Sequence, residues 1–314
     1  MTIKAFLPLT FLILIASLTI AQDLGPEHYD EDGNAIPLRK SGFFTGIYVG
    51  SYFPNSHSAT LYDGYGFDYE ENRNSYENSW MYQKIINQYG NVDDGNPDYI
   101  AEALGVQAGQ WIFDESDMPV NMRYKTTFLV GFTGRYTLDP RNAILINVNG
   151  AILKAAGNFT ITSTVQLPGS TQINSNIKTC NISGEEQRLQ IQTGYQHLFG
   201  KSESVNFFAE GGLHATLAIF DKSEIQIENL YINLYEYYYN SNTGYTFDTA
   251  PPPVGLGFGA FAGAGVNFAT QSKWDIQFVY NLLLENVRIG YDQKIKPGQS
   301  VGLRAYYNLA KKKQ

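Results

Sequence analysis

The chain has 314 residues, a formal net charge of −8 and a single cysteine. An acidic chain is poorly suited to nucleic acid, because affinity for phosphate needs clustered lysine and arginine. The lone cysteine, Cys180, excludes an internal disulfide framework, and we expect it to be an unreactive thiol in a loop. The 23 tyrosines and 30 glycines favour a β-rich protein that meets an interface.

The N-terminus carries the features of a secretory signal peptide. Lys4 precedes an apolar stretch over 5–20, and small residues end at Ala21. This pattern predicts cleavage after residue 21, with an uncleaved N-terminal helix as the alternative. Cleavage there would remove Lys4 but no acidic residue, so the formal net charge would change from −8 to −9. Residues 22–42 form a polar tail, in which Asp30, Asp32 and Asn34 resemble part of a calcium loop; the downstream glutamate is missing, so an ordinary turn is favoured.

Eight segments then alternate apolar and polar residues, the period of a β-strand. The segment that begins at Val254 places glycine at nearly every second position, which argues against a buried helix, since each interior helical glycine costs about 1 kcal/mol relative to alanine. In the segment over 274–291 the alternation changes phase after Asn286, which suggests a bulge. The other six segments span about 43–53, 121–137, 143–155, 186–199, 205–221 and 300–309.

The connections between these segments alternate in length. Short connections are expected at 138–142, 200–204 and 271–273, and longer ones at about 54–119, 166–184, 222–253 and 292–299. An even number of strands with this asymmetry predicts an all-β, eight-stranded antiparallel transmembrane barrel, with both termini periplasmic and the long loops extracellular. The alternative is a soluble sandwich or lipocalin-like barrel, whose apolar face points inward.

The polar face of the strands decides between these alternatives. It combines charged residues with many Gly, Gln and Asn, whereas a solvated face would be richer in Lys and Glu. This composition favours a packed polar lumen of paired charges. The predicted lumen network comprises Arg123, Lys125, Arg135, Arg188, Glu210, His214, Asp275, Glu285 and Arg304.

This architecture, over residues 43–309, resembles the small OmpA-, OmpX- and OmpW-like outer-membrane barrels. The resemblance implies an outer-membrane location. Many members of this group end on an aromatic residue used in barrel assembly, whereas here a basic tail over 310–314 follows Tyr307 and Leu309, either of which could serve instead. The triplet Asp248-Thr249-Ala250 is similar to the O-glycosylation signal of Bacteroidota.

The connection over 54–119 is far longer than ordinary loops and is expected to be an extracellular cap. Helical spacing appears over 75–89, and Asn96-Pro97 would start a second helix that stops at Gly105. We expect the cap either to plug the barrel or to bind a partner, because exposed aromatic residues suit protein or sugar binding. The candidate partner surface is Trp80, Trp111, Tyr231, Tyr235, Tyr237, Tyr238, Tyr239 and Tyr245.

The sequence offers little for catalysis. An eight-stranded barrel is filled by its own side chains, and the glycines of the Val254 segment would leave room for Tyr48, Tyr52 and Arg304. His214 lies four residues from Glu210 and could pair with it, but no serine and histidine share a strand rim, and no metal-ligand spacing occurs. We therefore expect no enzyme activity and no cofactor.

The function expected is that of a structural or accessory subunit, or an extracellular binding surface, of an envelope complex for secretion or uptake. Its partners would be outer-membrane lipid and a protein of that complex, and not nucleic acid. The alternatives are a narrow OmpW-like channel for small solutes and an outer-membrane lipid-modifying enzyme.

Overall fold

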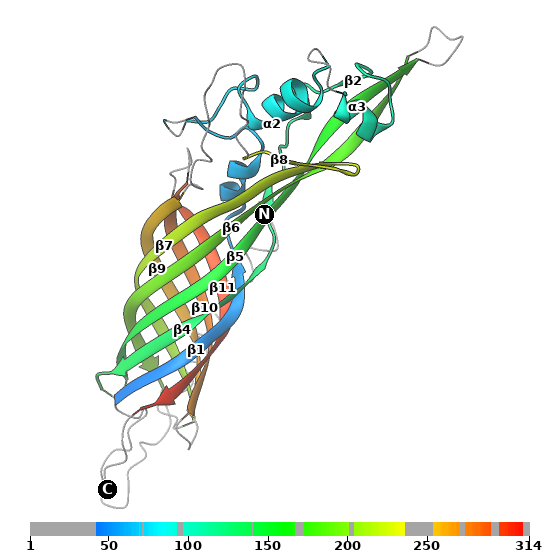
Figure 1. The fold of residues 1–314 in the computed structure, drawn as a ribbon. Coiled ribbons are helices and arrows are strands. Elements are labelled where there is room, and N and C mark those ends of the chain that lie inside the picture. The colour runs from blue at the N-terminus through cyan, green and yellow to red at the C-terminus, as the bar shows by residue number, and fades with distance from the viewer. Residues whose placement is uncertain are drawn as a thin grey trace, which may run out of the picture.

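The chain forms a closed β-barrel with a group of short helices at one end (Figure 1). The computed structural model describes residues 42–68, 70, 72–92, 97–139, 141–166, 173–200, 204–235, 254–269, 274–289 and 295–309. The predicted signal peptide, the C-terminal tail over 310–314 and the Asp248-Thr249-Ala250 triplet lie outside these residues, as does the N-terminal tail apart from Gly42. Within the described residues, the helices are all too short or too polar to cross a bilayer.

Eight strands close the barrel, and each is antiparallel to both of its neighbours. In ring order they are β1 (Gly42–Phe53), β4 (Thr127–Thr137), β5 (Asn142–Gln166), β6 (Ile173–Phe199), β7 (Val205–Ile227), β9 (Val254–Ala269), β10 (Trp274–Arg288) and β11 (Lys296–Asn308). Three shorter strands, β2 (Trp111–Ile112), β3 (Arg123–Tyr124) and β8 (Leu230–Asn233), extend the sheet beyond the ring. The predicted eight-stranded antiparallel barrel is confirmed.

Polar residues point into the barrel and apolar residues point out. On β5, Asn147 and Asn149 are buried, whereas Ile144, Ile146 and Ile152 are exposed. The exposed apolar belt continues around the barrel through Ile47, Val49, Phe128, Val130, Phe132, Leu189, Ile191, Leu213, Leu256, Phe258, Ile276, Leu282, Leu284 and Leu303. On β5 the belt spans about nine residues, the length that a tilted strand needs to cross the hydrocarbon of a bilayer.

Aromatic residues concentrate at the end of the belt that carries the short turns. Trp274 packs edge-to-face on Tyr307 at 5.2 Å between ring centroids. Phe43, Tyr136 and Tyr195 are exposed at the same level, because Phe43 lies opposite Tyr136 in the ladder and Ile144 lies opposite Tyr195. Such a ring is typical of the interface between hydrocarbon and water.

Strands β5, β6 and β7 continue far past the barrel mouth as a three-stranded sheet, here called the arm (Figure 1). The expected loop over 166–184 is wrong, because β5 and β6 stay paired from Asn142 and His197 to Gln166 and Ile173. The loop expected from residue 222 also starts too early, because β7 runs to Ile227 and turns into β8. Beyond Ile152 the arm extends β5 by ~45 Å at 3.3 Å per residue.

Two bulges change which side chains face outward at the base of the arm. Val130 lies opposite Gly150 and Tyr124 lies opposite Ala155. The chain therefore advances six residues from Tyr124 to Val130, while β5 advances only five from Gly150 to Ala155. A one-residue bulge therefore lies between β3 and β4. The pairing of β6 with β7 has a second register shift, which lies between Glu185 and Glu186 of β6.

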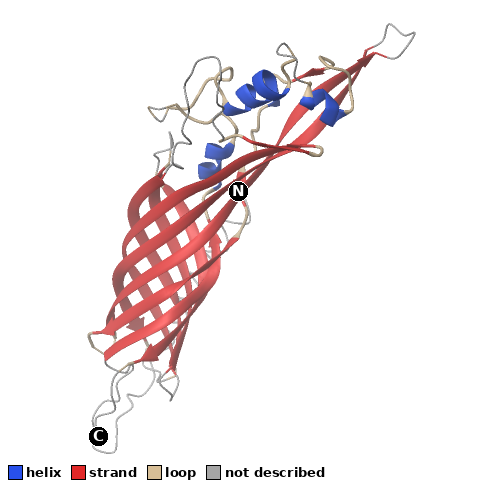
Figure 2. Cartoon of the chain, in the orientation of Figure 1, coloured by secondary structure: helices blue, strands red, loops and turns tan. Residues whose placement is uncertain are grey.

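The helices of the long connection after β1 cover the inner face of the arm. They are η2 (Ser56–Tyr62), α2 (Trp80–Tyr82), the π-helical η3 (Gln83–Tyr89), α3 (Tyr99–Leu104) and η4 (Glu115–Asp117). Figure 2 shows these helices gathered at the barrel mouth and along the arm. We call residues 54–122 the cap. Its buried Met81, Ile85 and Ile100 share one apolar cluster with Phe159 and Ile182 of the arm.

Local capping explains where the two predicted helices begin and end. Helical structure begins at Trp80 rather than at Ser75, because the Ser79 hydroxyl accepts the Tyr82 backbone N–H. The second helix is capped by Asp98 instead of Asn96-Pro97 and ends, as predicted, at Gly105, whose φ is 70°. Helix η2 was not predicted.

Candidate functional site: the closed lumen and the outer face of the arm

The glycines of β9 let side chains of β7 and β10 meet across the lumen wall. Gly259 lies opposite His214 on one side and Glu285 on the other. Without a side chain between them, His214 Nε2 and Glu285 Oε2 approach to 2.9 Å. Gly263 stands in the same way between Glu210 and Asn281. The glycine stripe is therefore needed for contacts between the two strands that flank it.

The expectation that these glycines make room for Tyr48, Tyr52 and Arg304 is wrong for the two tyrosines. Other glycines lie beside them: Gly50 and Gly302 beside Tyr48, and Gly298 beside Tyr52. Arg304 benefits indirectly, because the space above Gly263 holds Glu210, which is its ion-pair partner.

Two ion pairs fill the lower and middle lumen. Near the short turns, Arg135 Nη2 donates to Asp275 Oδ2 at 2.5 Å, and the guanidinium lies between the rings of Phe44 and Tyr306. In the middle, Arg304 donates two hydrogen bonds of 2.7 Å to the two carboxylate oxygens of Glu210. Such bidentate pairs are among the strongest hydrogen-bonded contacts in proteins.

A larger network occupies the upper lumen around Arg188. Its Nε donates to Glu186 Oε1 at 2.5 Å, and its Nη1 donates to Glu285 Oε1 at 3.1 Å. The Thr216 hydroxyl donates to Glu285 Oε2 at 2.6 Å and also lies 2.7 Å from His214 Nε2. His214 is thus a hydrogen-bonded interior histidine, and its carboxylate partner is Glu285 rather than Glu210, because the glycine at 259 lets it reach across.

Seven residues of the predicted lumen network lie buried inside the barrel, namely Arg135, Arg188, Glu210, His214, Asp275, Glu285 and Arg304. Arg123 and Lys125 do not, and their placement is a correction. Both are exposed on the outer face of the arm. The bulge between β3 and β4 is the reason, because it turns Tyr124 inward and its neighbours outward.

Tyr62 of the cap packs at the upper end of the lumen. Its ring stacks on Phe220 with centroids 5.5 Å apart and fits against Gly184, where a Cβ would lie 2.0 Å from the ring. Its hydroxyl donates to Glu186 Oε2 at 2.9 Å, next to a hydrogen bond of equal length from Tyr124. Burial, and then the charge of Glu186, raise the pKa of Tyr62, so the hydroxyl keeps its proton and remains a donor. The cap is thereby joined to the Arg188 network.

Of the described members of the predicted partner surface, Trp80 and Trp111 belong to the cap and Tyr235 packs against it. Trp80 and Tyr235 pack on each other and on Phe220, and the Trp111 indole N–H donates to Asp98. Tyr231 is 59% exposed. The remaining members, Tyr237, Tyr238, Tyr239 and Tyr245, lie outside the described residues.

Cys180 lies on β6 and not in a loop. It is buried in the cluster between the arm and the cap. Burial, and then the nearby Glu228 carboxylate, raise the pKa of the thiol to about 11. A thiol of this kind is a poor nucleophile at neutral pH.

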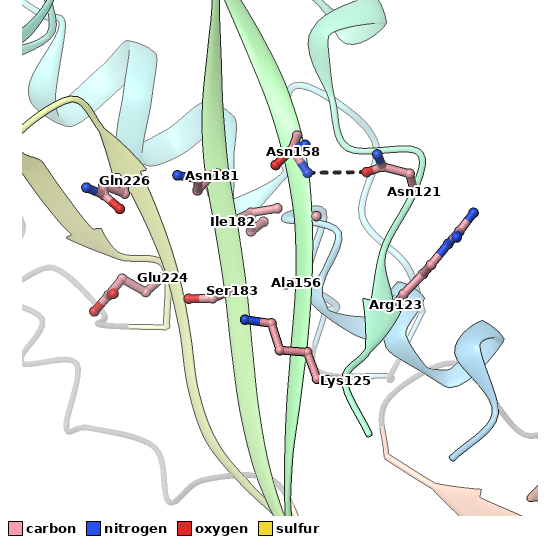
Figure 3. Close-up of a pocket in the computed structure, with 11 residues that line it drawn as sticks. Asn121, Arg123, Lys125, Ala156, Asn158, Asn181, Ile182, Ser183, Glu224 and Gln226 are labelled. Atoms are coloured by element: carbon pink, nitrogen blue, oxygen red, sulfur yellow. Dashed lines mark hydrogen bonds between the residues drawn. The ribbon is translucent and has the colours of Figure 1, made fainter. Parts of the chain in front are cut away.

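The outer face of the arm carries the pocket shown in Figure 3. Its volume is about 680 Å³. It lies over β5 and β6, with Arg123 and Lys125 on one side and Glu224 and Gln226 on the other. The complete lining is Asn121, Arg123, Lys125, Ala156, Gly157, Asn158, Asn181, Ile182, Ser183, Glu224 and Gln226. Sequence reasoning missed this site, because it expected loops at 166–184 and 222–253.

The described residues offer no group of His, Cys, Asp and Glu that could hold a metal ion. His197 lies beside Asn142, at the end with the short turns. The cluster of Thr216, His214 and Glu285 is enclosed in the lumen, with Thr216 fully buried, so a lipid in the bilayer has no access to it.

Comparisons with known proteins give a distant match in fold. No protein-family model matches the chain, and no curated protein does. Two crystal structures of Ail, the attachment invasion locus protein of Yersinia pestis, cover 85% of this chain and 99% of their own, at 12% identity. Their TM-scores are 0.31, for Ail in complex with the heparin analogue sucrose octasulfate, and 0.28 for Ail alone.

The distribution of polar and apolar side chains in the barrel shows the class of protein more directly than these matches do. A soluble barrel buries apolar side chains inside, whereas this one buries Arg304 and Glu210 in the lumen and exposes isoleucine, valine and phenylalanine around the outside. An exterior of this kind is stable only against lipid. The chain is therefore a small, eight-stranded transmembrane β-barrel of the outer-membrane type.

Proposed function

We propose that the protein is a non-enzymatic outer-membrane barrel that presents its arm as a binding surface for a protein partner in an envelope complex. In this proposal the short turns and both ends of the barrel chain are periplasmic, and the arm and cap are extracellular. The observation that carries the proposal is the arm itself: three strands continue past the apolar belt, with the cap covering one face and no described element covering the other.

The upper part of the outer face suits a protein partner. Thr162 on β5 lies opposite Ile112 on β2 and Ile177 on β6, so the three residues form one row across the sheet. Ile112 is 47% exposed and Ile177 is 66% exposed. Exposed apolar side chains in a flat strand row are the kind of contact that a partner buries at the centre of an interface.

The structure weakens the two alternatives without removing them. A narrow channel is favoured by the polar lining of the lumen, but ion pairs cross that lumen and Tyr62 of the cap donates to the buried Glu186 at its upper end. A lipid-modifying enzyme would need a nucleophile and a base that lipid can reach, and the Thr216–His214–Glu285 cluster is enclosed. A binding role uses the arm and requires neither an open path nor a reactive group in the lumen.

The test is purification of the tagged chain from native outer membrane in mild detergent, with mass spectrometry of the proteins that remain bound. A stoichiometric partner is expected to disappear when Ile112 and Ile177 are both changed to lysine. The matched control is Val120→Lys in the cap, where the side chain is 94% exposed, and it should retain the partner. A monomer without a partner would overturn the proposal, and conductance across planar bilayers would then test the channel.

A further inference from the structure

The pocket on the outer face of the arm has the construction of a small-ligand site. Ala156 and Ser183 lie opposite each other in the ladder, at its centre, and their short side chains leave the space. Longer side chains surround them, with Arg123 opposite Ala156 and Glu224 opposite Ser183. At about 680 Å³ the space is within the range of pockets that bind small molecules.

One side of the pocket is cationic. Arg123 and Lys125 belong to the segment beside β5; in Figure 3 Lys125 projects over the sheet toward Ser183, whereas Arg123 projects away from it. Within the described chain neither side chain forms an ion pair or a hydrogen bond. Other lysines of the arm are paired: Lys154 lies 3.1 Å from Glu185, and Lys178 lies 3.1 Å from Glu228. An unpaired lysine that reaches over the pocket, with an unpaired arginine on the same segment, favours an anionic group there.

The upper side of the pocket is a row of amides. Asn158, Asn181 and Gln226 lie opposite one another on β5, β6 and β7, and the row ends at Tyr231 on β8. A fourth amide, Asn121, is held in place because its Oδ1 accepts the Asn158 backbone N–H at 3.2 Å. Amides both donate and accept hydrogen bonds, as sugar hydroxyls require, and a tyrosine ring offers a flat apolar face.

The position of the pocket relative to the apolar belt also bears on its ligand. Lys125, at the lower edge of the pocket, lies in a row of mostly basic residues with Lys154, Glu185 and Lys222. The belt ends two residues lower on β5, at Ile152. The centre of the pocket, at Ala156, therefore lies ~13 Å along the tilted strand beyond the end of the belt, at 3.3 Å per residue. The headgroup region adds ~5–8 Å to each side of the hydrocarbon, so the pocket lies at the outer edge of that region.

We propose that this pocket binds an anionic saccharide, a sugar that carries phosphate or carboxylate. Lys125 would hold the anionic group, with Arg123 beside it adding positive charge, and the amide row would bind the hydroxyls. The carboxylate of Glu224, on the opposite side, repels the anion and accepts hydroxyl hydrogen bonds, so the sugar is bound in one orientation. This inference is independent of the protein partner proposed above, because it needs neither Ile112 nor Ile177.

The test is isothermal titration of the full chain in detergent micelles with three probes: a bisphosphorylated glucosamine disaccharide without acyl chains, the same disaccharide without phosphate, and inorganic phosphate. Two variants remove the site in different ways. The double variant Arg123→Gln/Lys125→Gln removes the cations, and Ser183→Phe fills the floor. The matched control is Arg141→Gln/Lys178→Gln, which removes two charges at exposed or paired positions outside the pocket.

We expect the phosphorylated disaccharide to bind at least about 10-fold more tightly than either other probe, and to weaken as salt rises. Both pocket variants should weaken it at least about 10-fold, and the control should not. Three results would each overturn the proposal. The phosphorylated disaccharide does not bind, it binds no more tightly than inorganic phosphate, or the control variant loses as much affinity as the pocket variants. An intact near-native melting curve for each variant excludes misfolding as the cause of a loss.

The same chemistry occurs in a lipid headgroup and in a free saccharide, and a second arm separates these sources. The protein purified from native membrane is analysed by mass spectrometry for bound lipid, in the wild type and in the cation-removed variant. Phosphorylated glycolipid that is retained by the wild type and lost from the variant identifies the headgroup as the source. Binding of the free disaccharide without such lipid identifies a soluble saccharide.

Discussion

Tyr62 joins the cap to the barrel, so its replacement tests whether the cap is a fixed plug. The side chain is fully buried, its ring stacks on Phe220, and its hydroxyl donates to Glu186 at 2.9 Å. Tyr62→Phe removes the hydrogen bond and keeps the ring, whereas Tyr62→Ala removes both. The two variants separate the polar contribution from the packing contribution.

The structure sets the size of each effect. A hydrogen bond to a charged acceptor contributes about 1.5–3 kcal/mol, which is the expected loss of docking free energy for Tyr62→Phe. Truncation of a buried aromatic side chain to alanine costs about 3–5 kcal/mol, since it leaves a cavity as well. Because about 1.4 kcal/mol is a factor of ten, Tyr62→Ala should raise the undocked population of the cap by at least about 100-fold.

Hydrogen exchange of the cap in detergent micelles measures this population. Amides of η3 and α3 should exchange faster in the order wild type, Tyr62→Phe, Tyr62→Ala, while amides of β10 and β11 stay unchanged. Tyr231→Ala is the control, because that tyrosine is 59% exposed. If exchange in the cap is unchanged in Tyr62→Ala, the plug does not depend on this contact and the reasoning fails.

Three further changes test the lumen and the arm. Gly259→Ala should destabilise the barrel by about 1–3 kcal/mol in urea unfolding, because the new Cβ would lie 1.7 Å from the Leu284 carbonyl oxygen. Asp275→Asn should cost about 3–5 kcal/mol by the same assay, because Arg135 is left without its counter-charge, and adding Arg135→Met should recover much of this loss. Cys180 should be alkylated ~100-fold more slowly at pH 8 than a thiol of pKa 9, since a pKa raised to about 11 leaves that much less thiolate, and the rate should rise with pH up to about 11.

Each of these changes has a matched control in the chain. Gly150→Ala should be tolerated, because its new Cβ has no neighbour closer than 3.9 Å. Glu77→Gln, at an exposed position of the cap, should leave urea unfolding nearly unchanged. A cysteine placed at the exposed Thr179 should react at the ordinary rate. Should the buried and exposed positions behave alike, the burial inferred for the three sites would be contradicted.

The sequence predicts the barrel because the bilayer imposes a strict alternation. Every lipid-facing position between Ile144 and Ile152 must lack charge, while its neighbours can be Asn147 or Asn149, and this contrast is visible without a structure. The buried charges inside the barrel follow from the same alternation. Their partners do not, because pairing depends on register: His214 reaches Glu285 only through the gap at Gly259.

The arm and its pocket could not be predicted for a related reason. Above the belt the outer face of β5 is polar, with Asn158, Thr160 and Thr162, and polar runs of this kind also occur in loops. The bulge beside Lys125 likewise could not be predicted, because one extra residue in a strand has no characteristic sequence here. A one-residue shift is nevertheless enough to move a side chain from the lumen to the outside.

The same sheet reverses its polarity at the end of the belt, and this reversal explains why the cap belongs to the fold. Below that level β5 points Asn147 inward and Ile152 outward; above it, Phe159 points inward and Asn158 outward. The inward apolar face of the arm has no barrel around it, so it is stable in water only when another segment covers it. The cap supplies that cover through Met81 and Ile85. Within the described residues no element covers the opposite face, which carries the pocket, and it is on this face that we propose binding.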